Sequence, residues 1–392
     1  MQKNKLNFKN GKFKIMQIAD VQDIFPVSAD SIKLLRLALK KEKPDLAVFT
    51  GDQIYGLDPR LRIGNTRANV EAIIASYLAP LNEANVPFCV TFGNHDAQCG
   101  ISNEEQSLIY SKYPGFIGGM QRDGDPGTTV IPVYDESGKR RIFEIFLFDS
   151  GGQSATGEYF PVKKEQLDRY KEIRRSEKEN GESIPHIVFQ HIPVPEFFDV
   201  IKKVPRHTKG AVEAFRTHKN EFYVLPDEIK ASGGFMLESP ATPDKNSGEF
   251  DILKSDGGCL AIAVGHDHNN SFVADLDGIK LIYTQCAGFN VYGPKRKRGV
   301  RIFELDESNT NAFTTRTVTF DSLCSDKLQK PFTEFVLTHI PTSMEQVKRA
   351  AALTVAAAAV SAASIIITVK AKKDKKNNER NRIKYRNKPI SF

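Results

Sequence analysis

The chain of 392 residues lacks tryptophan and contains few cysteines. The cysteines are scattered and odd in number, and none forms a C-x-x-C pair: Cys89, Cys99, Cys259, Cys286 and Cys324. This pattern argues against a disulfide framework and against a zinc site built from thiolates. We therefore expect buried free thiols in a reducing compartment.

Several catalytic signatures are also absent. The sequence has no G-x-S-x-G elbow, no P-loop and no G-x-G-x-x-G fingerprint. A serine hydrolase, a nucleotide-dependent motor and a Rossmann dehydrogenase therefore have no support.

Positive charge is concentrated near one end of the chain. The formal net charge is +7, but residues 350–392 alone hold ten Lys and Arg against Asp374 and Glu379, which gives +8. The net charge of the rest of the chain is therefore −1, which is near neutral. A near-neutral body gives no reason to expect a nucleic-acid-binding surface.

Residues 350–369 carry no charge. Twenty residues are about one bilayer crossing, although nine of these are alanine. We expect a membrane-spanning or membrane-embedded helix, and the alternative is an amphipathic or interaction helix. The expected organisation is a catalytic domain over 1–340, a membrane-associated helix over 341–370 and a basic tail over 371–392, which could bind anionic lipid heads.

Two features of the sequence bear on location and conflict. Basic residues after the apolar stretch favour a cytoplasmic tail, which would place the body outside. The polar start of the chain is not followed by an apolar signal-peptide segment that would export the body. We expect a membrane-associated protein whose catalytic domain is cytoplasmic, because such an anchor requires no export signal.

Apolar strands and helices alternate along the body. The first half predicts strands over 13–19, 46–50 and 87–92, with helices over 31–40 and 70–81. The second half predicts a charged helix over 164–178, a polar excursion loop over 235–255, and strands over 142–148, 187–190, 260–264, 271–274, 280–284, 300–305 and 312–320. This alternation indicates an α/β layered sheet.

Polar residues follow the predicted strands at five places. They are Asp20, Asp52, Asn94-His95-Asp96, His191 and His266-Asp267-His268. A single Asp after a strand is usually a cap or turn residue. In open α/β sheets, however, ligands collect at the carboxyl ends of strands. Five such strand ends together therefore predict a shared site.

These segments resemble, in order, the motifs of calcineurin-like metallophosphoesterases. The resemblance spans roughly residues 13–305 and rests on Ile18-Ala-Asp20, Gly51-Asp52, Gly93-Asn94-His95-Asp96, Val188-Phe-Gln-His191 and Gly265-His266-Asp-His268. The nearest resemblance is to purple acid phosphatases and their relatives. It implies a four-layer α/β/β/α sandwich, in which two mixed β-sheets pack face to face with helices outside.

The resemblance also implies a binuclear metal centre. Asp52 would bridge two cations, since neighbouring cations need a shared anionic ligand. Asp20 and His268 would complete one site. The other site would be completed by Asn94, His191 and His266. Oxygen and nitrogen donors suit iron paired with iron, zinc or manganese better than calcium.

The implied reaction is hydrolysis of a phosphomonoester by metal-bound hydroxide. His95 would protonate the leaving oxygen, and Asp96 would orient His95 by a hydrogen bond that raises its basicity. A phosphodiesterase with the same centre is the alternative within the enzyme class. A non-catalytic, membrane-tethered scaffold is a third hypothesis, which the nearly complete motifs disfavour.

One motif departs from the common family pattern. Most members have Asp-x-His first, whereas this chain has Asp20-Val-Gln22. Purple acid phosphatases also lack that histidine and use the tyrosine of Gly-Asp-x-x-Tyr, which matches Gly51-Asp52-Gln-Ile-Tyr55. Tyr55 would then be a phenolate ligand of a ferric ion. In the alternative, Tyr55 packs beside the site, and Gln22 binds the metal or a water.

Two further acidic residues leave alternatives open. Glu196 could contact a metal-bound water or cap the next helix, and we favour the cap. Asp149, in Asp149-Ser-Gly-Gly, could line the substrate cleft or form only a strand-to-loop turn.

Overall fold

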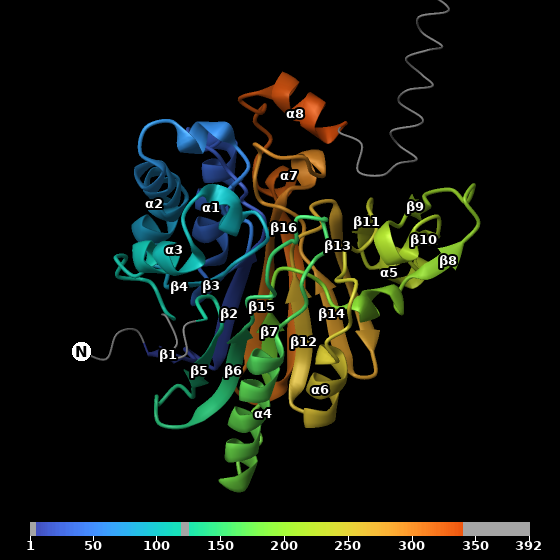
Figure 1. The fold of residues 1–392 in the computed structure, drawn as a ribbon. Helices are drawn as coiled ribbons and strands as arrows, with labels where there is room; N and C mark the ends of the chain where they lie inside the picture. The colour runs from blue at the N-terminus through green and yellow to red at the C-terminus, as the bar shows by residue number, and fades with distance from the viewer. Residues whose placement is uncertain (1–4, 119–124, 340–392) are drawn as a thin grey trace, which may run out of the picture. The chain divides into compact units, whose positions relative to one another are not determined.

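The structure, a computed structural model, describes residues 5–118 and 125–339 (Figure 1). The chain divides into two units, Met1–Ile340 and Pro341–Phe392. The predicted helix over 350–369 and the basic tail lie outside the described residues. Within the described residues, no helix is both long enough and apolar enough to cross a membrane.

A five-stranded mixed sheet is built from the two ends of the first unit. Its order is β16-β15-β2-β3-β4, with β2 at Lys12–Ile18, β3 at Leu46–Thr50, β4 at Phe88–Thr91, β15 at Gly299–Asp306 and β16 at Asn309–Thr319. Strands β2, β3 and β4 are parallel, and β15 runs antiparallel to β2 and β16. Helices α1 (Ala29–Glu42) and α2 (Thr66–Ala84) connect the parallel strands.

An eight-stranded mixed sheet comes mostly from the middle of the chain. Its order is β1-β5-β6-β7-β12-β14-β13-β11. The strand bounds are β1 Leu6–Asn7, β5 Thr129–Tyr134, β6 Arg141–Leu147, β7 His186–Phe189, β11 Phe235–Met236, β12 Cys259–Val264, β13 Asn270–Leu276 and β14 Ile279–Tyr283. Strands β6, β7, β12 and β14 are parallel, so their carboxyl ends meet at one edge.

Three buried apolar clusters define the layers. One cluster joins α1 and α2 to the five-stranded sheet through residues such as Phe49. A second cluster contains residues of both sheets, including Val48 and Phe189, so the two sheets pack against each other. The third joins the eight-stranded sheet to α4 (Lys164–Glu179) and α6 (Glu249–Asp256). The mixed α/β fold expected from the resemblance is therefore confirmed, with helices on both outer faces (Figure 1).

The structure corrects the prediction for residues 235–255. This segment contains β11 and α6 rather than a loop alone. Helix α6 forms because Phe250 and Leu253 lie one turn apart and are 3% and 0% exposed against the core. The surrounding prolines and polar residues made the segment resemble a loop, so the short apolar face of α6 was not recognised in the sequence.

The remaining elements are short. A three-stranded antiparallel sheet has the order β8-β10-β9, with β8 at Lys202–Val204, β10 at Phe222–Val224 and β9 at Val212–Glu213. The small helices are α3 (Asn103–Tyr110), α5 (Asp227–Ala231), α7 (Phe320–Leu323) and α8 (Pro331–Thr338).

Candidate metal centre

Residues that follow strands of both large sheets lie together at the carboxyl ends of those strands. Asp20, Asp52 and Asn94 follow β2, β3 and β4, whereas His191 and His266 follow β7 and β12. The structure brings these residues together as two groups whose possible ligand atoms lie within 4.8 Å of one another. The groups are Asp52, His191 and His266, and Asp20, Asp52 and His268. Asp52 belongs to both groups, as a bridging ligand would.

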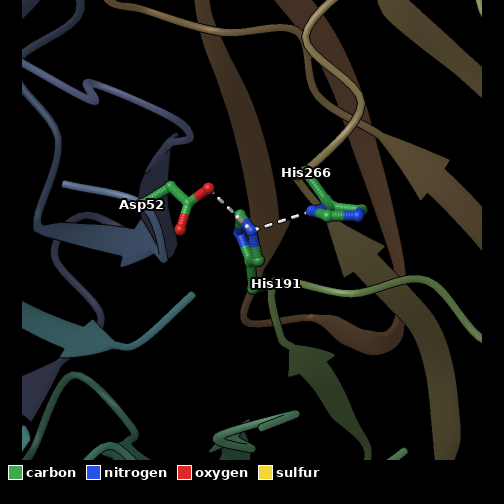
Figure 2. Close-up of side chains that lie close together, drawn as sticks. All are labelled: Asp52, His191 and His266. Atoms are coloured by element: carbon green, nitrogen blue, oxygen red, sulfur yellow. Dashed lines mark hydrogen bonds and ion pairs between the residues drawn. The ribbon is translucent and has the colours of Figure 1, made fainter. Parts of the chain in front are cut away.

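The first group converges on one ring nitrogen of His191 (Figure 2). His191 Nε2 lies 3.3 Å from Asp52 Oδ2, 3.2 Å from Asn94 Oδ1 and 3.1 Å from His266 Nδ1. His191 Nδ1 lies 2.9 Å from the carbonyl oxygen of Thr50. That carbonyl can only accept, so Nδ1 carries the proton and Nε2 keeps its lone pair in the neutral ring.

The second group is oriented by the backbone in the same way. His268 Nδ1 lies 2.9 Å from the carbonyl oxygen of Tyr292, whose ring stacks on the imidazole at 4.2 Å between centroids. His268 Nε2 therefore faces Asp20 Oδ1, 3.5 Å away. The Asp20 carboxylate also accepts the backbone N–H of His266 at 3.0 Å.

Sharp turns at the strand ends aim these side chains. Asp20, Asp52 and His266 have φ of 50°, 50° and 72°, a left-handed region that non-glycine residues rarely occupy. Two glycines allow the close packing. A Cβ on Gly51 would lie 2.6 Å from the His191 ring, and one on Gly93 would lie 2.3 Å from Asp52 Oδ1. Backbone strain of this kind concentrates at functional sites.

The buried charges shift one another's pKa. Burial raises the pKa of Asp20 well above its usual range. Burial also opposes ionisation of Asp52, but His191 and His95 outweigh it and lower that pKa. The pKa of His191 rises to about 10, since Asp52 and Asp20 favour its charged form more than burial disfavours it. Burial lowers the pKa of His268 to about 3. Opposed shifts among touching buried groups are typical of functional sites.

The residues fit two cations. Each group offers carboxylate oxygens and imidazole nitrogens, and the rings of His191 and His268 turn Nε2 toward Asp52 and Asp20. His266 Nε2 is buried and has no hydrogen-bond partner within residues 5–118 and 125–339. The donor set is therefore compatible with two metal ions.

Tyr55 and Gln22 are the two candidates to replace the missing first-motif histidine. The Tyr55 ring lies 5.7 Å from the His95 ring between centroids, beside the site. Gln22 is 3% exposed and has φ of 36°, and its backbone N–H donates to the Asp52 carbonyl at 2.7 Å. Both the Tyr55 and the Gln22 hypotheses stay predictions.

His95 lies beside the shared carboxylate, but its predicted partner is wrong. Its backbone N–H donates to Asp52 Oδ1 at 2.7 Å. Its ring Nδ1 lies 2.7 Å from Gln98 Oε1. The Asp96 carboxylate instead accepts backbone N–H groups of Gly93, Gln53 and Ile54 at 2.9, 2.9 and 3.1 Å. Asp96 therefore shapes the loop, and Gln98 orients the imidazole.

The two further acidic candidates are also placed. Glu196 lies in the short helical turn Pro195–Phe198, where Val194 is the cap, so the favoured capping role is wrong. Its Oε1 accepts from Asn246 at 2.6 Å, and it belongs to neither ligand group. Asp149 lines a cavity together with Gly93.

A positioning residue escaped the sequence analysis. The guanidinium of Arg298 is fully buried and donates to the carbonyl oxygens of Gly288, Val291 and Tyr292 at 2.6, 2.7 and 3.3 Å. It therefore fixes the loop whose Tyr292 carbonyl orients His268. In the sequence, Arg298 closes a basic run that is typical of an exposed loop.

The profile of the calcineurin-like phosphoesterase family matches residues 13–270, more than half of the chain. The fold and the candidate site agree with this match. The chain therefore belongs to the calcineurin-like phosphoesterase family.

Its similar proteins include phosphatases. A "probable inactive purple acid phosphatase 14" of Arabidopsis thaliana is 27% identical over 77% of each chain. "Phosphatase DCR2" of Saccharomyces cerevisiae is 25% identical over 78% of this chain and 53% of that protein. A solved dimetal phosphatase from Danio rerio is 15% identical, with a TM-score of 0.45 over 79% of this chain and 99% of that chain.

Proposed function

We propose that this protein is a phosphohydrolase that cleaves phosphomonoesters at a binuclear metal centre. The metal pair would be iron with iron, zinc or manganese. One observation carries the proposal: two groups of ligand atoms share the carboxylate of Asp52, and Oδ1 of that carboxylate accepts the backbone N–H of His95. Asp20 and His268 would hold one cation. Asn94, His191 and His266 would hold the other.

The residues of the chain would position the substrate and move a proton. Bound cations would supply positive charge for the phosphate oxygens and activate water as the nucleophile. Gln98 Oε1 accepts from Nδ1 of His95 and thereby leaves Nε2 of the half-buried ring for proton transfer. As an imidazolium, His95 would donate its Nε2 proton to the leaving oxygen and keep the Nδ1 proton that faces Gln98.

Some relatives are named probable inactive phosphatases, which makes the scaffold hypothesis worth testing. The chain retains Asn94, His95 and both histidines of the last motif. This integrity supports an active enzyme.

The function is tested by parallel assays on the full chain after loading with iron, zinc or manganese. We expect two metal ions per chain by elemental analysis. We also expect kcat/KM at least about tenfold higher for 4-nitrophenyl phosphate than for bis(4-nitrophenyl) phosphate, since a tenfold ratio needs only about 1.4 kcal/mol of transition-state preference. The opposite ratio would favour the phosphodiesterase, and a metal-free inactive protein would favour the scaffold.

Tyr55 gives a spectroscopic prediction. If its phenolate binds a ferric ion, the iron-loaded protein absorbs in the visible region and Tyr55→Phe loses that band. Loss of the hydroxyl alone should leave the fold intact, because the half-buried ring stays beside His95. An active iron-loaded protein without a visible band, or a protein that is active only with zinc or manganese and colourless, would contradict a ferric phenolate. A matched Tyr159→Phe variant, whose ring packs 4.5 Å from His266, should keep the band.

We further propose association with a membrane through 350–369 and the basic tail, with the catalytic domain on the cytoplasmic side. This proposal rests on the uncharged stretch and its basic flank.

A further inference from the structure

A cavity of about 840 Å³ opens beside the candidate metal centre. It is lined by Gly93, which begins the motif that carries His95, and by Ala97, which follows that motif. Gly93 packs directly against Asp52, because a Cβ there would lie 2.3 Å from the carboxylate. It also reaches Leu167 of α4 and Ile252 of α6. The cavity therefore reaches the loop that carries His95, the proposed proton donor to the leaving group.

One wall of the cavity is apolar. It is formed by the loop Phe160, Pro161 and Val162. The Phe160 ring is 46% exposed, although its neighbour Val162 is 2% exposed. An exposed aromatic ring on a cavity wall offers a flat face for a ring or chain of a ligand.

The cavity lining also contains a polar pair, Asp149 and Asn103. Asp149 is 6% exposed, and its carboxylate accepts the Gly151 N–H at 3.0 Å and the Asn103 amide at 3.3 Å. Within the described residues, no Lys or Arg forms an ion pair with Asp149, and the amide oxygen of Asn103 has no partner. The Asn103 oxygen can only accept, and the Asp149 carboxylate accepts when it is ionised, so a donor on the ligand would complement them.

The charge of the lining argues against an anionic ligand. Three lysines are balanced by three acidic residues: Lys163, Lys164, Lys171, Asp149, Glu165 and Asp168. Lys163 lies 3.5 Å from Asp125, and both Lys164 and Lys171 pair with Asp168. A second phosphate group would find no surplus of positive charge.

We propose that this cavity binds the leaving group of the substrate, and that this group has an apolar ring carrying a hydroxyl or amino donor. The inference rests on the proposed phosphomonoesterase function. The ring would lie against Phe160, and the donor would reach the acceptors of Asn103 and Asp149.

A matched pair of substrates measures the contribution of the ligand's hydrogen-bond donor. The compounds 4-(2-aminoethyl)phenyl phosphate and 4-ethylphenyl phosphate share the same ester bond and differ by one amino group. With the metal-loaded full chain, we expect about tenfold higher kcat/KM for the amino compound. Asn103→Leu should bring the ratio close to one. An unchanged ratio in that variant, or equal values in the wild type, would overturn the proposal.

A matched pair of variants isolates the apolar wall. Phe160 and Phe215 are similarly exposed, at 46% and 42%, but only Phe160 lines the cavity. Phe160→Ala should raise KM for both ring substrates about tenfold, whereas Phe215→Ala should not. Equal effects of the two variants would overturn the proposal, and this test holds even if Asn103→Leu fails to fold.

Phenyl phosphate separates this inference from the proposed function. If phenyl phosphate is hydrolysed but neither the preference for the amino substrate nor the effect of Phe160→Ala is seen, the cavity proposal is refuted and the proposed function stands. If the two-metal protein hydrolyses no phosphomonoester, both proposals are refuted.

Discussion

Asp52→Asn is expected to remove both metal ions and to lower kcat/KM at least about a thousandfold, since each bound cation contributes several kcal/mol of transition-state stabilisation. The substitution keeps the size of the side chain and an oxygen that can accept the His95 N–H. It removes the charge that both ligand groups share. Elemental analysis of the purified variant and assays with 4-nitrophenyl phosphate measure the two effects.

A buried carboxylate elsewhere provides the control for Asp52. Glu144 is fully buried and pairs with Arg141 and Arg174 at 2.9 and 3.4 Å. Glu144→Gln therefore disturbs a buried charge network without touching either ligand group, and two metal ions should remain bound. Loss of only one ion in Asp52→Asn would show that Asp52 serves a single site rather than a bridge.

His95→Ala should lower kcat for phenyl phosphate about a hundred- to ten-thousandfold while both metal ions stay bound. The imidazole belongs to neither ligand group, so its removal leaves the ligand atoms in place. A proton donor matters most for a poor leaving group. The loss should therefore be much smaller for 4-nitrophenyl phosphate, whose leaving phenolate needs little protonation.

The way in which the rate loss of His95→Ala depends on the leaving group shows whether His95 transfers a proton or only packs beside the site. His218→Ala, which removes a half-buried imidazole stacked on Phe198, should leave the rates on both substrates unchanged. An equal loss for both substrates in His95→Ala would contradict general acid catalysis. Gln98→Ala should show a weaker form of the same pattern, because it only releases the orientation of His95.

The strands that build the site could be predicted because they are buried on both faces. The prediction over 46–50 coincides with β3, since such strands consist of nearly continuous apolar residues. Short, half-exposed elements carry no comparable pattern. Strand β8 begins with Lys202 and Lys203, and nothing in its composition distinguishes it from a loop.

The same contrast holds within the site. Asp20, Asp52, His191 and His266 were predicted because they follow buried strands. Gln98 and Arg298 act through contacts that only the fold creates, namely with the His95 ring and with three backbone carbonyls. The mistaken role of Asp96 has the same origin, since its neighbour in sequence turned out not to be its partner in space.

The ligand groups draw on both sheets at once, and this has a consequence for stability. A cation held by Asp52 from one sheet and His191 from the other would act as a cross-link between two halves of the domain. Any ion that binds only the folded chain adds to its stability, by about 2.7 kcal/mol when present at a hundred times its Kd. Metal supply would thereby set both how much of the protein is active and how long each molecule survives heat or proteolysis.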